Sequence, residues 1–202
     1  GALIGIDEAG RGPLAGPVTA AAAYLPRDFQ CAGLNDSKKL DEKARELLFE
    51  EFQKRRNEDM IFGVGFSSSE EIDTLGILPA NFLAMRRALA NLALPKGQSL
   101  KDFSLLIDGR DRIPEVHGVQ QYPIIKGDSR ARCIAAASIL AKVSRDRKML
   151  AYAKEYPEYS FEKHKGYGTK SHLEALQRVG PCAIHRKSFA PVRRCLEKSQ
   201  TS

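Results

Sequence analysis

Four carboxylates in this sequence stand where strands are predicted to end. Asp7 and Glu8 follow one short apolar run, Asp108 follows a second, and Asp128 follows a third. In a mixed sheet flanked by helices, polar residues just beyond the carboxyl ends of strands tend to form the ligand site. Adjacent side chains on a strand point to opposite faces, so Asp7 and Glu8 share a site only if the strand ends there. The loop at 10–13 fits such an end, and we therefore expect the four side chains to converge.

Carboxylates gathered at one point repel one another unless a cation lies among them. A like-charge pair about 4 Å apart costs roughly 1 kcal/mol in water and several times more near a protein surface. Because the set offers only oxygen donors, without His or Cys, it favours Mg²⁺ or Mn²⁺ over zinc. Each carboxylate taken singly is also explained as a cap or turn residue, and Asp108-Gly109 is a common turn dipeptide. The residue types alone leave a metal site and a structural role both open.

The net charge points to a polyanionic partner. The 202 residues include 32 Lys and Arg against 25 Asp and Glu, which gives a net charge of +7. A basic protein with an acidic metal site suggests phosphodiester hydrolysis, in which two ions about 4 Å apart activate a water and stabilise the leaving oxygen. The alternative is a non-catalytic, basic nucleic-acid-binding protein. Acidic residues argue against that alternative, because they repel a bare phosphate backbone.

The apolar pattern predicts a mixed sheet flanked by helices. Short apolar runs indicate strands, and amphipathic or alanine-rich stretches indicate helices. We expect strands over 2–6, 17–25, 61–66, 103–107 and 122–125, and helices over 41–55, 77–92, 134–152 and 171–179. A few strands in succession, followed by alternating helices and strands, are typical of an α/β fold.

Nothing in the sequence indicates secretion or a membrane anchor. The longest uncharged stretch, 12–26, is shorter than a membrane-spanning helix and is interrupted by prolines. No basic leader precedes an apolar segment. The four cysteines are scattered, without zinc-ligand or redox spacing. We expect a soluble, cytoplasmic, monomeric protein with reduced thiols, and the sequence does not reveal which proteins it binds.

Several motifs, in order along the chain, resemble those of type 2 ribonucleases H, specifically the bacterial ribonuclease HII family. They lie at 6–18, 35–40, 108–109, 126–128, 134–147, 164–169 and 185–191. The resemblance covers nearly the whole chain. It implies a ribonuclease H-like five-stranded mixed sheet flanked by helices, with a catalytic core over 1–152 and a helical C-terminal extension over 153–202 packed on that core.

The resemblance also implies a reaction and a site. The expected activity is metal-dependent endonucleolytic cleavage of RNA in RNA–DNA hybrids, together with incision 5′ to a single ribonucleotide in duplex DNA. The products carry a 3′-hydroxyl and a 5′-phosphate. Asp7, Glu8, Asp108 and Asp128 take the roles of catalytic, metal-binding carboxylates. A nuclease for hybrids in general, with little preference for single ribonucleotides, is a third interpretation.

The substrate contacts of the family map onto a glycine-rich loop and one tyrosine. Glycine allows main-chain atoms to approach a sugar closely, and the 2′-hydroxyl distinguishes RNA from DNA. The resemblance places Gly10, Arg11 and Gly12 around the ribonucleotide, and Tyr167 against the sugar at its junction with DNA. Without the resemblance, the tripeptide is typical of a tight turn and the tyrosine of ordinary surface packing.

Ser37, Lys38 and Lys39 offer hydroxyl and ammonium donors to phosphates. The same segment also fits a helix N-terminus, with Asp36 or Ser37 as its cap. Both interpretations can hold together, because a capping hydroxyl and a phosphate contact do not exclude each other.

The basic residues of the helix over 134–152 and the later histidines are expected to be less direct participants. Lys142, Arg145 and Arg147 are expected to form the solvated face of that helix. His164 and His185 belong to the family motifs. We expect them to have structural or phosphate-side roles rather than catalytic ones.

Overall fold

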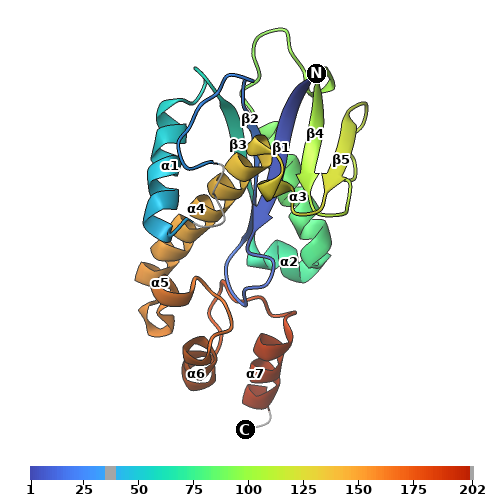
Figure 1. Ribbon diagram of the computed structural model, residues 1–202. Coiled ribbons are helices and arrows are strands. Elements are labelled where there is room, and N and C mark those ends of the chain that lie inside the picture. The colour runs from blue at the N-terminus through green and yellow to red at the C-terminus, as the bar shows by residue number, and fades with distance from the viewer. Residues whose placement is uncertain (35–39, 201–202) are drawn as a thin grey trace.

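A five-stranded mixed sheet forms the centre of the computed structural model, which describes residues 1–34 and 40–200 (Figure 1). Its strands are β1 Ala2–Ala9, β2 Val18–Tyr24, β3 Ile61–Ser67, β4 Phe103–Asp108 and β5 Gln120–Ile124. They lie in the order β3-β2-β1-β4-β5. β1, β2 and β3 form an antiparallel meander, whereas β4 lies parallel to β1 and β5 parallel to β4. The prediction of a mixed five-stranded sheet is confirmed.

The described helices are α1 Glu42–Lys54, α2 Ser69–Leu75, α3 Ile77–Ala90, α4 Arg132–Glu155, α5 Phe161–His164, α6 Lys170–Val179 and α7 Ala190–Gln200. The four predicted helices correspond to α1, α3, α4 and α6. The cap of α1 is Asp41, whose Oδ1 accepts a hydrogen bond from the Ala44 N–H, so the expectation of Asp36 or Ser37 as the cap is wrong. Within the described residues, no helix combines the length and the apolar composition needed to cross a bilayer.

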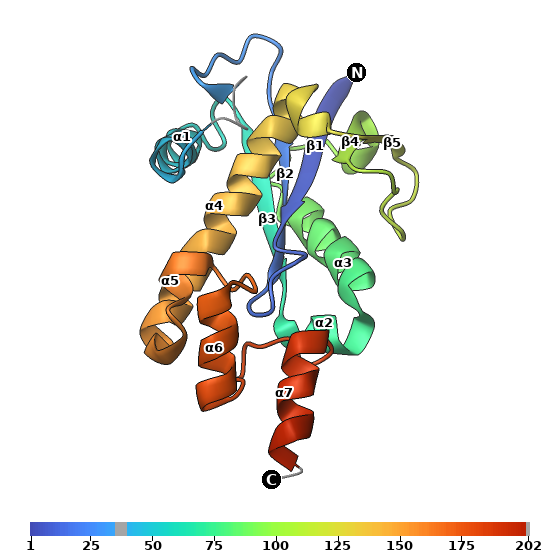
Figure 2. The same ribbon diagram turned by 60° about the horizontal axis from the view of Figure 1, so that its bottom comes forward.

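Helices cover both faces of the sheet, with α4 and α1 on one side and α3 on the other (Figure 2). Glycines let the two longest of these approach the strands closely. A Cβ on Gly5 of β1 would lie 2.2 Å from the carbonyl carbon of Cys133 in α4. A Cβ on Gly65 of β3 would lie 2.2 Å from the carbonyl oxygen of Ala84 in α3. Helix backbone therefore packs directly on strand backbone, which fixes the layers at short spacing.

Side chains along β1 alternate between these two layers. Ile6 is fully buried in the core shared with α3, so Glu8 lies on the α3 face and Asp7 faces α4. The ladder with β2 continues to the pair of Ala9 and Thr19. The expectation that the strand ends before Asp7 is therefore wrong: both carboxylates lie within β1, on opposite faces.

Segments after α4 return to the loop that follows β1. The Leu14 N–H donates to the carbonyl of Gly166 at 2.8 Å, and the Arg186 N–H donates to the carbonyl of Leu14 at 2.8 Å. The Gly16 N–H donates to the carbonyl of Ile184 at 2.9 Å. The loop at 10–17 is thus held from both sides by parts of the chain that are distant in sequence.

Two buried histidines, His185 and His172, form a directed hydrogen-bond chain beneath the turn that carries Tyr167, and a third packs against them. His185 Nδ1 accepts from the Cys182 N–H at 2.9 Å, so its Nε2–H donates to His172 Nε2 at 3.0 Å. His172 Nδ1–H in turn donates to the carbonyl of Tyr167 at 2.9 Å. The ring of His164 stacks on that of His172, with centroids 4.5 Å apart. The two bonds in which a ring nitrogen accepts require neutral imidazoles. A proton on His185 Nδ1 would face the Cys182 N–H, and a proton on His172 Nε2 would face the His185 Nε2–H.

This chain predicts an acid-sensitive stability. Burial, together with His172, lowers the pKa of His185 to about 4. Below about pH 6.5 this residue therefore takes up a proton in the unfolded chain but not in the folded protein. The free energy of unfolding should therefore fall, by on the order of 1–2 kcal/mol for this residue, between about pH 7.5 and pH 5. Chemical denaturation at the two pH values should show a smaller fall for His185→Asn than for the wild type.

The matched control is His117→Gln, at an exposed position. The control should retain the full wild-type pH dependence. An equal pH dependence in the wild type and in His185→Asn would contradict the assignment of a neutral, buried His185.

Candidate active site

Asp7 is a buried carboxylate at the α4 face of β1. Only 6% of its surface is exposed, and its Oδ1 accepts from the Glu8 N–H at 2.7 Å. Burial raises its pKa well above the usual range, and the charges of Glu8 and Asp108 raise it further. The Glu8 N–H and the hydroxyl of Ser138 in α4 favour the ionised form, but more weakly. Asp7 is therefore held in a place that disfavours its own negative charge.

Glu8 lies on the opposite face and has a different environment. Burial raises its pKa, while the Arg11 guanidinium, whose Nη1 lies 3.4 Å from Oε1, lowers it. Asp108 raises the pKa again, and the side chain of Asn81 lowers it by hydrogen bonding. Asn81 is 2% exposed, and its Oδ1 has no hydrogen-bond partner among the described residues. Glu8 and Asp7 thus face separate supports, from α3 and α4, while both sense the charge of Asp108.

Asp108 is the last residue of β4, the parallel neighbour of β1. Its Oδ1 accepts from the Gly127 N–H at 2.6 Å, which ties the end of β4 to the 3₁₀ turn Gly127–Ser129. A Cβ on Gly127 would lie 2.5 Å from Ile134 Cδ1, so a larger residue there would push the Ile134 side chain of α4 aside. Asp128 lies in the same turn, and its Oδ1 accepts from the Ser129 N–H at 3.0 Å.

The carboxylates of Asp7, Glu8 and Asp108 fit a hard divalent cation in charge and atom type, but they are not gathered closely around one point. The acidic groups that raise the pKa of Asp7 offer only oxygen ligands, and a cation among them would relieve the repulsion. In residues 1–34 and 40–200, however, no three His, Cys, Asp or Glu side chains are grouped closely enough to hold a metal ion.

A pocket of about 370 Å³ adjoins Glu8. Its lining consists of Glu8, Ala9, Gly10, Arg11, Gly12, Ser138, Lys142 and Tyr167. Tyr167 is 44% exposed, and an added Cβ on Gly12 would lie 3.9 Å from Cε1 of its ring. The structure therefore brings the glycine-rich loop and the tyrosine to one place. Ser37, Lys38 and Lys39 lie outside the described residues.

Two lining residues, Ser138 and Lys142, were missed by the sequence interpretation. They are four positions apart on α4, which places them on one face of the helix. A single hydroxyl inside the alanine-rich run was the available signal. Lys142 Nζ lies 2.8 Å from Asp146 Oδ1, and the lysine side chain is 32% exposed and borders the pocket.

The other two basic residues of α4 differ from each other. Arg147 pairs with Glu46 and Glu50 of α1 near the surface, as expected for a solvated face. Arg145 is 1% exposed, so its expected place on that face is wrong. Helical periodicity did not reveal this, because a buried arginine needs acceptors that only the fold supplies.

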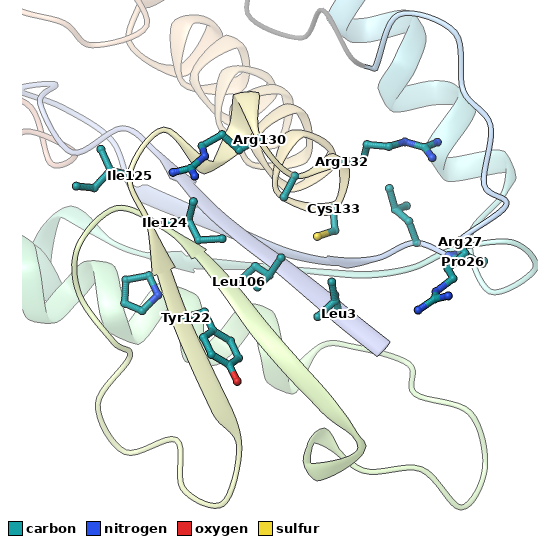
Figure 3. Close-up of a pocket in the computed structure, with 13 residues that line it drawn as sticks. Leu3, Pro26, Arg27, Leu106, Tyr122, Ile124, Ile125, Arg130, Arg132 and Cys133 are labelled. Carbon is teal, nitrogen blue, oxygen red and sulfur yellow. The ribbon is translucent and has the colours of Figure 1, made fainter. Parts of the chain in front are cut away.

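A larger groove, of about 1050 Å³, opens between β4, β5 and the start of α4 (Figure 3). Apolar side chains such as Leu106, Tyr122 and Ile124 line it together with Arg130 and Arg132. None of the described residues that line it is acidic. The groove therefore has no group for metal-assisted hydrolysis, and the smaller pocket beside Glu8 is the candidate active site.

Known structures share this fold. Ribonuclease H2 from Pyrococcus horikoshii OT3 is 24% identical and superposes with a TM-score of 0.78 over 100% of both chains. Bst-RNase HIII in complex with Mn²⁺ is 17% identical, with a TM-score of 0.74 over 100% of this chain and 71% of that one. At these identities the likeness concerns the fold.

Sequence comparison is more specific. The family model described as Ribonuclease HII matches residues 4–192. Ribonuclease HII of Endomicrobium trichonymphae is 53% identical over 192 residues, covering 94% of this chain and 86% of the relative. Ribonuclease HII of Fusobacterium nucleatum is 52% identical over 200 residues, covering 98% and 89%. Nothing in these matches supports the non-catalytic alternative. The chain belongs to the ribonuclease HII family, metal-dependent endoribonucleases that act on RNA–DNA hybrids.

Proposed function

We propose that this enzyme uses Asp7, Glu8, Asp108 and Asp128 to hold Mg²⁺ or Mn²⁺ and incises duplex DNA 5′ to a single embedded ribonucleotide. The observation that carries the proposal is the buried Asp7, which senses the charges of Asp108 and of Glu8, and Glu8 lines a pocket of about 370 Å³. A buried carboxylate with its charge opposed in this way is typical of a functional site. The products carry a 3′-hydroxyl and a 5′-phosphate, and RNA–DNA hybrids are also cleaved.

The protein's contribution is position and charge rather than a covalent nucleophile. The metal, when bound, supplies activation of water and stabilisation of the leaving oxygen. Asp7 is fixed by the Glu8 N–H, and Asp108 by the Gly127 N–H. Lys142, at the edge of the pocket, offers a cation to the phosphate.

Recognition falls to the exposed rim of the same pocket. Gly10, Arg11 and Gly12 contact the ribonucleotide, and Tyr167 packs against its sugar; all four line the pocket. Ser37, Lys38 and Lys39 bind flanking phosphates. The net charge of +7 supports such binding, because phosphate contacts are largely electrostatic.

The remaining assignments belong to the same proposal. Residues 1–152 act as the catalytic core and 153–202 as an extension that supports the pocket through the turn at Tyr167. The enzyme acts as a cytoplasmic monomer, in the compartment where DNA that contains ribonucleotides is found in a bacterium. Hydrogen bonds between residues 14–16 and residues 166, 184 and 186 support the role of the extension.

Replacing Asp108 tests the catalytic carboxylates. Asp108→Asn should lower the rate of incision of a duplex with one ribonucleotide by about a hundredfold or more, because an electrostatic contribution of this kind is typically worth on the order of 10²–10³ in rate. Single-turnover assays with Mg²⁺ or Mn²⁺ give the measurement, and chelator should abolish cleavage by both proteins. Asp111→Asn, an exposed neighbour in the loop after β4, is the control and should cleave like the wild type.

The mapped cleavage position decides the substrate. Incision of the single-ribonucleotide duplex on the 5′ side of the ribonucleotide supports the proposal. An intact duplex with the wild type, alongside cleavage of a long hybrid, would favour the general hybrid nuclease instead.

Replacing Tyr167 tests recognition at the rim. Tyr167→Ala should weaken incision at a single ribonucleotide by about tenfold, within the ~1–3 kcal/mol that aromatic packing against a nucleotide contributes. Tyr167→Phe, which keeps the ring, should recover most of the rate. Tyr122→Ala, at a similarly exposed tyrosine in the larger groove, should have no effect. Unchanged incision by Tyr167→Ala would remove this residue from the site.

A further inference from the structure

The two largest fully buried side chains are arginines. Arg145 of α4 is 1% exposed and Arg186, just before α7, is 0% exposed. Neither forms an ion pair with a carboxylate in the described part of the chain. Burying a guanidinium group without an acidic partner costs free energy. The groups that accept its hydrogen bonds therefore indicate which part of the structure it stabilises.

All the acceptors are backbone carbonyls, and nearly all belong to the loop after β1. Arg186 donates from Nε to Gly16 at 3.0 Å, from Nη1 to Arg11 at 2.9 Å and from Nη2 to Gly10 at 2.6 Å. Arg145 donates from Nε to Pro17 at 3.0 Å, from Nη2 to Ala15 at 3.1 Å and from Nη1 to Lys165 at 3.0 Å. The two guanidinium groups therefore hold both ends of the loop, and Arg145 also holds the turn just before Tyr167.

The bonds from Arg186 fix the direction of two N–H groups. In a trans peptide the C=O and the following N–H point in opposite directions. When the carbonyls of Gly10 and Arg11 point inward to Arg186, the N–H groups of Arg11 and Gly12 point outward, to the exposed side of the loop. No hydrogen bond joins either N–H to another described residue. Two adjacent donors are thus presented at the wall of the pocket beside Glu8.

The first glycine of the loop serves this arrangement. Gly10 has a φ of +91°, and an added Cβ would lie 2.0 Å from Arg145 Nε. The absence of a side chain at Gly10 therefore makes room for Arg145 rather than for a sugar. Gly12 is different, because a Cβ there would meet only the Tyr167 ring, at 3.9 Å. Arg145 also lies 5.8 Å from the centroid of that ring, which links the loop to the tyrosine.

We infer that Arg186 and Arg145 are positioning residues that preset the Gly10–Gly12 loop, so that the Arg11 and Gly12 N–H groups are aimed at the ribonucleotide before it binds. The inference rests on the proposed recognition of a ribonucleotide at this pocket. Two buried positive charges behind the loop also attract the anionic backbone that carries the sugar. Preset donors avoid the entropic cost of ordering the loop at each binding event.

The first test replaces the guanidinium group of Arg186 by the ammonium group of a lysine. Arg186→Lys keeps the charge but cannot serve three carbonyls in the geometry of a guanidinium. Affinities for a duplex with one ribonucleotide and for an all-deoxy duplex of the same sequence are measured by fluorescence anisotropy in chelator, with incision rates measured in Mg²⁺. The variant should lose about tenfold in affinity and incision for the ribonucleotide duplex, which corresponds to ~1.4 kcal/mol. Its affinity for the all-deoxy duplex should stay unchanged.

Arg55→Lys is the control, because Arg55 also donates to a carbonyl, that of Gln30, far from the pocket. A purely structural role for Arg186 predicts equal losses on both duplexes, and that result would overturn the inference. A wild type that binds and incises both duplexes alike contradicts the proposed function, and the inference with it. A selective wild type with an equally selective Arg186→Lys contradicts the inference alone.

A second measurement on the wild type does not depend on whether a variant folds. Backbone ¹⁵N relaxation of the free protein should give order parameters of about 0.85 for Arg11 and Gly12, as in rigid strands. Their amide resonances should shift on addition of the ribonucleotide duplex and much less with the all-deoxy duplex. Order parameters below about 0.6 in the free protein would show a loop that is ordered only by substrate, which overturns the inference.

Discussion

One buried negative charge constrains much of this structure. Asp7 sits within β1, beneath α4, where burial and two further carboxylates disfavour its ionised form. α4 can lie this close because Gly5, two residues earlier on the same face, leaves room for its backbone. The same helix brings Ser138 to Asp7, and Lys142 to the pocket. The charges that allow this site to attract a divalent cation therefore lower the stability of the folded protein when no metal is bound.

On the other side of the pocket the protein buries positive charge by different means. Asp7 has few groups that favour its charge, whereas Arg145 and Arg186 are surrounded by carbonyl oxygens of the loop at 10–17. Burial, with Arg145 as its neighbour, lowers the pKa of Arg186 to about 9, so it stays protonated at neutral pH. Carbonyl dipoles satisfy the donors without cancelling the charge. The pocket thus lies between a buried carboxylate, Asp7, and two buried guanidinium groups, Arg145 and Arg186. This arrangement is suited to binding a metal ion and a phosphodiester together.

The sequence predicted the five-stranded sheet well, because apolar runs and turn residues are local signals. The end of β1 was placed too early, since Asp7 and Glu8 are poor strand residues that remain in the ladder only because β2 pairs with them. α5 and α7 were missed because each depends on packing around Tyr159, Leu176 and their neighbours. Arg145 was placed on the surface for a similar reason: its acceptors Pro17 and Ala15 are more than a hundred residues away in sequence. Contacts between distant parts of the chain decide which carboxylates and hydrogen-bond donors lie at one pocket. Local sequence patterns therefore do not predict this grouping.

The most direct measurement of the central claim is the thermal unfolding of Asp7→Asn and the wild type, in chelator and in excess Mg²⁺. Because burial and neighbouring charges raise the pKa of Asp7 in the folded state, its ionisation destabilises the fold above the pKa of the unfolded carboxyl, so removing the charge should stabilise the metal-free protein at neutral pH. The variant should melt at a higher temperature than the wild type in chelator. Mg²⁺ should then raise the melting temperature of the wild type more than that of the variant, since a ligand stabilises the state that binds it. A variant that melts at or below the wild type in chelator, with no difference in the response to Mg²⁺, would contradict the account.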